Sequence, residues 1–309
     1  MTSDTAPGTQ PGLSSGPVTG RHPFFGLGLA ACAALLLSPD TLFMRWSEMD
    51  GFAMLAWRGL LTALVLLGVF VLFTRERRAA LRAATGAVGL TVIATQTVNT
   101  TLFSLSVSIA PVSVVLFGVA TTPIWAAVFG RFILHEPTRK TTWITIFAVM
   151  TGIGIAVLTG PDGRPALSAP VMLGALGGLT VGASLALTFV LLRRASGLSI
   201  LLVVGLGSLI SGLGGLLVAG DTVFDGTLWA IAISGLVLLP VSFFSLSFAS
   251  RYTNASNVSL LLLLETVLGP LFVWAGAGEA PTGAMLIGGA IVVASLAAYL
   301  LSESRRRAM

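Results

Sequence analysis

The sequence has little charge, a single cysteine and a single lysine. Only 9% of its 309 residues are charged, whereas 55% are hydrophobic. A soluble chain of this length cannot bury so much apolar surface, so lipid must surround most of it. The one cysteine, Cys32, excludes an internal disulfide. The one lysine, Lys140, does not belong to a Gly-x-x-x-x-Gly-Lys loop, which excludes a Walker-type ATP motor.

Histidine is almost as scarce, and its placement argues against enzymatic chemistry. His22 and His135 lie at the ends of apolar runs, without metal-ligand spacing and without a nucleophile elbow nearby. The positive net charge of +5 comes from basic residues at the ends of apolar runs. This distribution is typical of a membrane topology rather than of a phosphate-binding face. We therefore expect no metal, no cofactor, no nucleic-acid partner and no enzymatic activity.

Long apolar runs predict an all-α integral membrane protein with ten transmembrane helices. Each run must be helical, because lipid offers no hydrogen-bond partner to the backbone. The predicted spans are 24–45, 51–73, 86–108, 112–134, 141–159, 170–192, 199–219, 228–250, 254–275 and 281–301.

Basic residues between the spans predict the orientation. Fourteen of them fall on one side of the membrane, two (Arg45 and Arg164) fall on the other, and Arg58 lies within a span. Because Lys and Arg accumulate on the cytoplasmic side, both termini are predicted to lie in the cytoplasm. The protein itself is predicted to lie in the cell membrane. The fourteen are Arg21, Arg75, Arg77, Arg78, Arg82, Arg131, Arg139, Lys140, Arg193, Arg194, Arg251, Arg305, Arg306 and Arg307.

Two stretches of the chain are similar to each other. Phe-Ser-Leu-Ser at 103–106 leads to Glu136, and the same four residues at 244–247 lead to Glu279. Thr122-Pro123 and Glu265-Thr266 precede those glutamates by the same distances. An odd number of spans in each half reverses the second copy, so we expect an inverted repeat. The predicted division is a disordered tail at 1–20, five-helix repeats at 21–160 and 165–303, and a basic tail at 304–309.

These features together resemble the EamA-type transporters of the drug/metabolite transporter superfamily. The resemblance covers most of residues 24–301 and rests on ten spans in two halves and on short motifs in them. The motif residues are Arg58 early in span two, a Pro or Glu near the middle of spans four and nine, Glu136 and Glu279 closing those spans, and Gly152, Gly154, Gly288 and Gly289 in spans five and ten. One difference is that Glu265 is followed by Thr266, and the proline of span nine comes later, at Pro270. The resemblance implies a secondary transporter, typically an exporter of amino acids or other small metabolites.

Three charged residues lie within the predicted spans and away from the span ends: Asp40, Arg58 and Glu265. Buried charges in a membrane usually face a protein interior or a water-filled path. Asp40 and Arg58 have two interpretations, contact with a solute or an ion pair that joins two helices. Glu265 has no evident partner in the sequence, and we interpret it as a solute-binding or proton-carrying group.

Span three carries a polar face. Gln96, Asn99 and Thr100 are spaced to lie on one side of a helix, where they either bind a polar solute or hydrogen-bond to neighbouring helices. Prolines interrupt four spans, at Pro39, Pro123, Pro240 and Pro270, and are the candidate hinges.

The leading hypothesis is a secondary transporter that moves a small polar solute across the lipid bilayer by alternating access. A proton is the candidate coupling ion. The alternatives are an uptake carrier of the same fold and a non-transporting membrane sensor or assembly subunit. Opposite charges at Arg58 and Glu265 would suit a zwitterionic solute.

Overall fold

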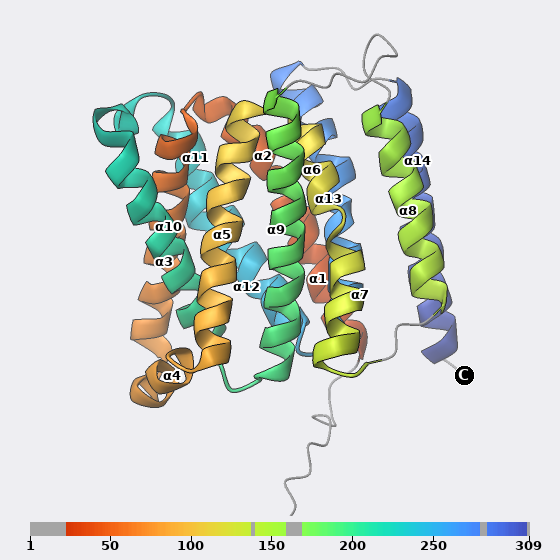
Figure 1. Ribbon diagram of the computed structural model, residues 1–309, viewed down its shortest axis with the longest axis horizontal. Helices are drawn as coiled ribbons and strands as arrows, with labels where there is room; N and C mark the ends of the chain where they lie inside the picture. Colours follow the sequence, from red (N-terminus) through yellow and green to blue (C-terminus); the bar gives the residue numbers. More distant parts are fainter. Residues whose placement is uncertain (1–22, 137–139, 159–168, 279–282, 308–309) are drawn as a thin grey trace, which may run out of the picture.

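The computed structural model describes residues 23–136, 140–158, 169–278 and 283–307, and every regular element in these ranges is helical (Figure 1). The predicted tail at 1–20, the junction between the halves and Glu279 lie outside the described residues. The elements are α1 (Pro23–Leu37), α2 (Asp40–Ser47), α3 (Gly51–Phe73), α4 (Arg77–Ala84), α5 (Ala87–Ile109), α6 (Val112–Val119), α7 (Thr122–Ile133), α8 (Lys140–Leu158), α9 (Ala169–Arg194), α10 (Ile200–Ala219), η1 (Gly220–Phe224), α11 (Leu228–Ile233), η2 (Ser234–Leu238), α12 (Leu239–Ala249), α13 (Ala255–Ala277) and α14 (Gly283–Arg307).

Eight segments of the described chain are long and apolar enough to cross a membrane. They coincide with eight of the ten predicted spans, and helices α8 and α14 occupy the other two. The protein is therefore an integral membrane protein with several apolar helices. Helix α14 continues to Arg307, so most of the predicted basic tail extends this helix.

Two of the crossing segments are interrupted between two α-helices. The first breaks between Leu37 and Asp40, at Pro39, and the fourth breaks between Val119 and Thr122, just before Pro123. Proline lacks an N–H donor and its ring disfavours helix at the preceding residue, so a break at or just before proline is expected.

The other two candidate hinges behave differently. Pro240 follows η2, a π-helical turn that widens the helix between α11 and α12. Pro270 lies inside α13, which is continuous from Ala255 to Ala277. The later position of this proline therefore leaves the segment around Glu265 helical.

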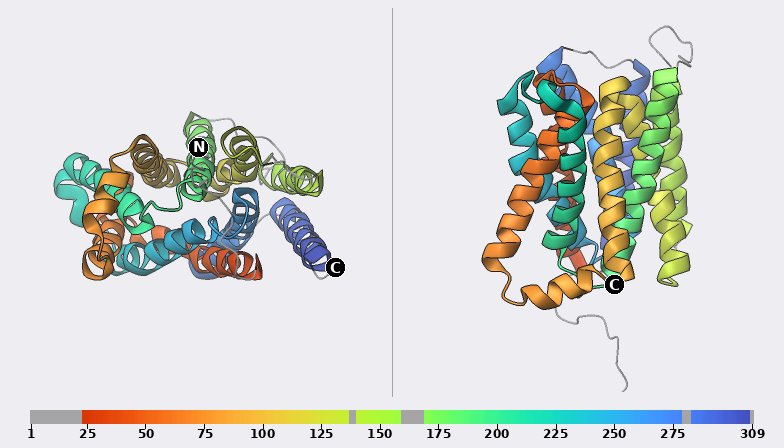
Figure 2. Two further views of the ribbon diagram at one scale, coloured as in Figure 1. Left: turned by 90° about the horizontal axis from the view of Figure 1, so that it is seen from below. Right: turned by 60° about the vertical axis from the view of Figure 1, so that its left-hand side comes forward.

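The helices stand side by side in one bundle (Figures 1 and 2). Helix α3 packs along α10, α5 along α9, α1 between α12 and α13, and α8 along α14. Glycines lie where the backbones of two neighbouring helices approach each other most closely. A Cβ added to Gly212 would lie 2.6 Å from the backbone nitrogen of Leu60, and one added to Gly178 would lie 2.2 Å from the carbonyl oxygen of Val115.

The two ends of the bundle differ in chemistry. The short helix α4 lies across one end, which we call the α4 end (Figure 1). At the opposite end, which we call the Asp50 end, the Asp50 carboxylate accepts hydrogen bonds from the backbone N–H groups of Phe52 and Ala53 and caps α3. Desolvation raises the pKa of Asp50, but these bonds and one from Thr222 outweigh it, and the pKa lies below its ordinary value.

Candidate functional site

A cavity of about 40 Å³ lies inside the bundle, with eight lining residues from each half of the chain. A volume of this size holds a few water molecules or one small polar group. The lining residues are Leu37, Asp40, Thr62, Gln96, Asn99, Thr100, Phe103 and Val119 from the first half, and Val181, Leu185, Ser208, Leu239, Phe243, Leu246, Leu262 and Glu265 from the second.

Five of the six residues singled out as solute-binding candidates line this cavity. They come from α2, α5 and α13, which are far apart in the sequence. The sixth, Arg58, is not a lining residue but forms an ion pair with Asp40, which is one. The five are Asp40, Gln96, Asn99, Thr100 and Glu265.

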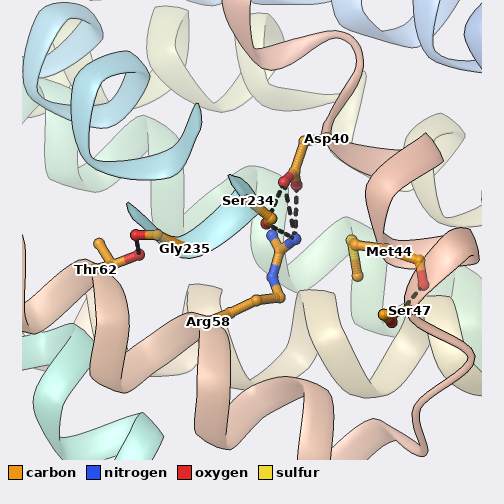
Figure 3. A network of polar contacts seen from close by, with 7 residues as sticks. All are labelled: Asp40, Met44, Ser47, Arg58, Thr62, Ser234 and Gly235. Carbon is orange, nitrogen blue, oxygen red and sulfur yellow. Dashed lines mark hydrogen bonds and ion pairs between the residues drawn. The ribbon is translucent and has the colours of Figure 1, made fainter. Parts of the chain in front are cut away.

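Arg58 forms a buried ion pair with Asp40 (Figure 3). The Nη1 atom of Arg58 lies 2.8 Å from Oδ2 of Asp40 and 3.0 Å from Oδ1, and the two side chains are 3% and 1% exposed. Ser234 completes the group, because Arg58 donates to its Oγ at 2.8 Å and Oγ donates to Asp40 at 2.5 Å. The ion pair that the sequence left as one of two interpretations is therefore present, while Asp40 also faces the cavity.

Local structure positions each member of this group. Asp40 is the first residue of α2, where the positive end of the helix dipole stabilises a carboxylate, and Pro39 sets that start. Arg58 reaches it from α3, and its guanidinium lies 5.7 Å from the ring centre of Phe103. Ser234 opens the π-helical turn η2, a type of turn that is frequent at functional sites.

The polar face predicted on span three lies on the cavity wall. Gln96 donates from Nε2 to Thr100 Oγ1 at 3.3 Å. The Oε1 atom of Gln96 and the Nδ2 atom of Asn99 are buried and have no hydrogen-bond partner. Buried polar atoms are rarely left unpaired, so these two groups favour a bound solute or water over contacts between helices alone.

Glu265 of α13 also lines the cavity, and this residue is 5% exposed. Among the described residues, no hydrogen bond or ion pair reaches its carboxylate. The charges that act on it are those of Asp40 and Arg58, which form an ion pair with each other. The cavity therefore contains one carboxylate without a counter-charge.

Several lining residues were not identified from the sequence. Thr62, which donates to the carbonyl of Gly235 at 3.1 Å, and Ser208 are single polar residues within apolar spans. Phe103 and Phe243 look like ordinary membrane-facing residues in sequence. One feature of the sequence could have identified Ser234 as a candidate, because it is a polar residue in an apolar run, six residues before Pro240. The candidate hinges Pro39, Pro123, Pro240 and Pro270 lie outside the lining set.

Polar contacts join the two halves at both ends of the bundle. At the α4 end, Arg193 of α9 lies 2.8 Å from the Glu136 carboxylate and also donates to the carbonyl of Thr253. At the Asp50 end, Trp57 donates to the carbonyl of Val223 at 2.7 Å. Contacts that join the halves at both ends are consistent with a cavity of small volume between these ends.

Comparison with known proteins agrees with this architecture. A crystal structure described only as that of a protein is similar, with a TM-score of 0.70 and 17% identity over 91% of this chain and 97% of the other. That likeness shows the fold alone, and no curated protein matches the chain. Residues 24–158 of this chain match the model of the EamA-like transporter family, a family of membrane transporters.

Proposed function

We propose that this protein is a secondary transporter that exports a small polar metabolite across the cytoplasmic membrane by alternating access. The observation that carries the proposal is the internal cavity, which both halves line equally and which contains unpaired polar atoms from α5 and the buried carboxylate of Glu265 from α13. A site between two halves is suited to open alternately to each side as one half moves against the other.

The packing between the halves supports an inverted repeat. If each span corresponds to the one five places later, α3 corresponds to α10 and α8 to α14, and both pairs are in contact. Under the same correspondence, α1 is equivalent to α9 and α12 is equivalent to α5. The α1–α12 pair and the α9–α5 pair are both in contact. A twofold axis through the cavity accounts for both observations.

Basic residues support the proposed orientation. The α4 end carries the arginines of α4 and the end of α9, whereas the Asp50 end carries acids such as Asp50 and Asp221. Because basic residues accumulate in the cytoplasm, we place the α4 end there.

A counterflow screen tests the function. Purified protein in proteoliposomes is loaded with one unlabelled solute, and uptake of the labelled solute is followed for amino acids, purines, polyamines and common toxic metabolites. We expect accumulation for one class that protein-free liposomes do not show. Folded protein that exchanges none of them would contradict the proposal.

Glu265→Gln is expected to remove the pH dependence of transport. The carboxylate is the one group of the cavity wall that has no counter-charge and is able to exchange a proton, whereas the amide of glutamine does not titrate. Initial rates measured between pH 5.5 and 8.5 check this, with Asp221→Asn as the control because Asp221 is exposed at the Asp50 end. An unchanged pH profile in Glu265→Gln would make Glu265 a structural residue.

Arg193→Gln is expected to favour a state that is open at the α4 end. The substitution removes the contacts of Arg193 with Glu136 and Thr253. A cysteine placed at Thr100 in a Cys32→Ser background should then react with a thiol reagent roughly threefold to tenfold faster. Arg194→Gln is the matched control, because Arg194 is exposed on the next position of α9. Equal labelling rates in both variants would show that this contact does not hold the end closed.

A further inference from the structure

Positive charge is concentrated where α3 passes into α4. Residues 75–82 contain four arginines and one glutamate, which is four positive charges against one negative and a net charge of +3. All five of these side chains are exposed, and among the described residues no ion pair joins any of them to another group. This corner of the α4 end therefore presents an unpaired positive charge. The five residues are Arg75, Glu76, Arg77, Arg78 and Arg82.

A hollow of about 560 Å³ lies at the same junction. Its volume is within the range of roughly 300–1,000 Å³ that is typical of small-molecule sites. Two of the lining residues are cationic and two are large and apolar, so the hollow offers a basic wall beside an apolar wall. The lining residues are Leu72, Phe73, Thr74, Arg75 and Arg77.

The end of α3 holds one of the two arginines in place. The Nε atom of Arg77 donates to the carbonyl of Thr74 at 3.1 Å, and its Nη2 atom donates to the carbonyl of Val71. The last carbonyls of a helix have no partner within the helix, so Arg77 satisfies two of them. A guanidinium group has five N–H donors, and the donors that these bonds leave can bind an anion. Among the described residues, no hydrogen bond or ion pair restrains Arg75, which can turn toward the same anion.

The hollow lies at the depth of the lipid head groups. Helix α3 is one of the segments that can cross the membrane, and it ends at Phe73. Leu72 and Phe73 are 75% and 77% exposed, so they face the lipid chains. The chain then turns into α4, which lies across the end of the bundle (Figure 1). Arg75 and Arg77 therefore leave the apolar region at the level where lipid phosphates are found.

This combination favours an anionic lipid over a free phosphate or a zwitterionic lipid. Arginine binds phosphate oxygens with charge-assisted hydrogen bonds, often two at a time. A free phosphate would use the basic wall and leave Leu72 and Phe73 without a partner. The ammonium group of a zwitterionic lipid would lie beside a segment with a net charge of +3. Basic segments directly next to a membrane span are typical sites for anionic lipids.

We propose that this hollow binds the head group of an anionic phospholipid. The phosphate lies between Arg75 and Arg77, and the acyl chains lie along Leu72 and Phe73. Helix α4 packs on α5 and α10, and Ala84 of α4 is buried among the residues of that contact. A bound lipid therefore tethers this corner of the bundle to one leaflet of the membrane. The proposal goes beyond transport and does not depend on it.

Native mass spectrometry of the purified full-length protein tests the proposal. The protein is released from detergent micelles that contain equal amounts of phosphatidylglycerol and phosphatidylcholine with the same acyl chains. We expect the protein to retain phosphatidylglycerol in preference to phosphatidylcholine. Arg75→Gln is expected to lower this preference about fivefold, which is the contribution of one basic residue beside an anionic membrane surface. Size-exclusion chromatography shows that the variant is folded.

Arg82→Gln is the matched control, because it makes the same change of charge on an exposed residue of α4 that does not line the hollow. This variant should keep most of the preference. An equal loss in both variants would overturn the proposal, because net charge rather than the hollow would then select the lipid. Equal retention of the two lipids by the unchanged protein, or an unchanged preference in Arg75→Gln, would also overturn it.

A competition experiment distinguishes a lipid from a free phosphate ester. We expect sn-glycerol 3-phosphate, which carries the phosphate without acyl chains, to leave phosphatidylglycerol bound. Its displacement of the lipid would assign the basic wall to a soluble phosphate ester and overturn the lipid proposal. None of these measurements needs a transported solute, so they are decided separately from the counterflow screen.

Discussion

Replacing Arg58 by glutamine is expected to lower the free energy of unfolding by about 3 kcal/mol or more. The substitution leaves the carboxylate of Asp40 buried at 1% exposure without its positive partner. Breaking a buried ion pair on one side typically costs about 3–5 kcal/mol, because the remaining charge has lost its solvation and its counter-charge. Thermal or denaturant-induced unfolding of the purified protein in detergent measures the loss, with exposed Arg194→Gln as the control.

The double variant Asp40→Asn with Arg58→Gln decides what the pair does. It removes both charges, so its stability should exceed that of the Arg58→Gln variant. A double variant that is less stable than either single variant would contradict the ion-pair argument. If the double variant is stable and still transports, the pair serves to join α2 and α3. Loss of transport in a stable double variant would assign Asp40 a direct role at the solute, consistent with its place on the cavity wall.

Replacing Gly212 by valine is expected to prevent the bundle from assembling. A Cβ at this position would lie 2.6 Å from the nitrogen of Leu60 and 2.8 Å from the carbonyl carbon of Gly59 on α3. Both are backbone atoms, which side-chain rotation does not move away, so α3 and α10 must separate. Overpacking of a core typically costs about 1–3 kcal/mol, and we expect the upper part of that range or beyond.

The fraction of protein that elutes as a single species in size-exclusion chromatography measures this effect. Gly214→Val is the matched control, since it makes the same change on the same helix where no atom lies within 4 Å of an added Cβ. Gly68→Val gives the equivalent control on α3. Normal elution of Gly212→Val would show that the close contact between α3 and α10 is not required for folding.

Much of the fold followed from the sequence, because the lipid environment imposes it. A backbone in a bilayer must be helical, so each long apolar run became a helix close to its predicted bounds. The breaks at Pro39 and before Pro123 follow from proline geometry. The π-helical turn at Ser234 was not predicted, since a turn of this kind depends on how neighbouring helices pack and has no simple residue pattern.

The sequence by itself determined which residues are costly to bury, namely Asp40, Arg58, Glu265 and the polar face of span three, because a charge or an amide in an apolar run needs a partner. It did not determine which partners they have. The tertiary structure decided that Arg58 is paired with Asp40 and Ser234 while Glu265 faces the cavity unpaired, because these contacts join α2, α3, η2 and α13 across large separations in the chain.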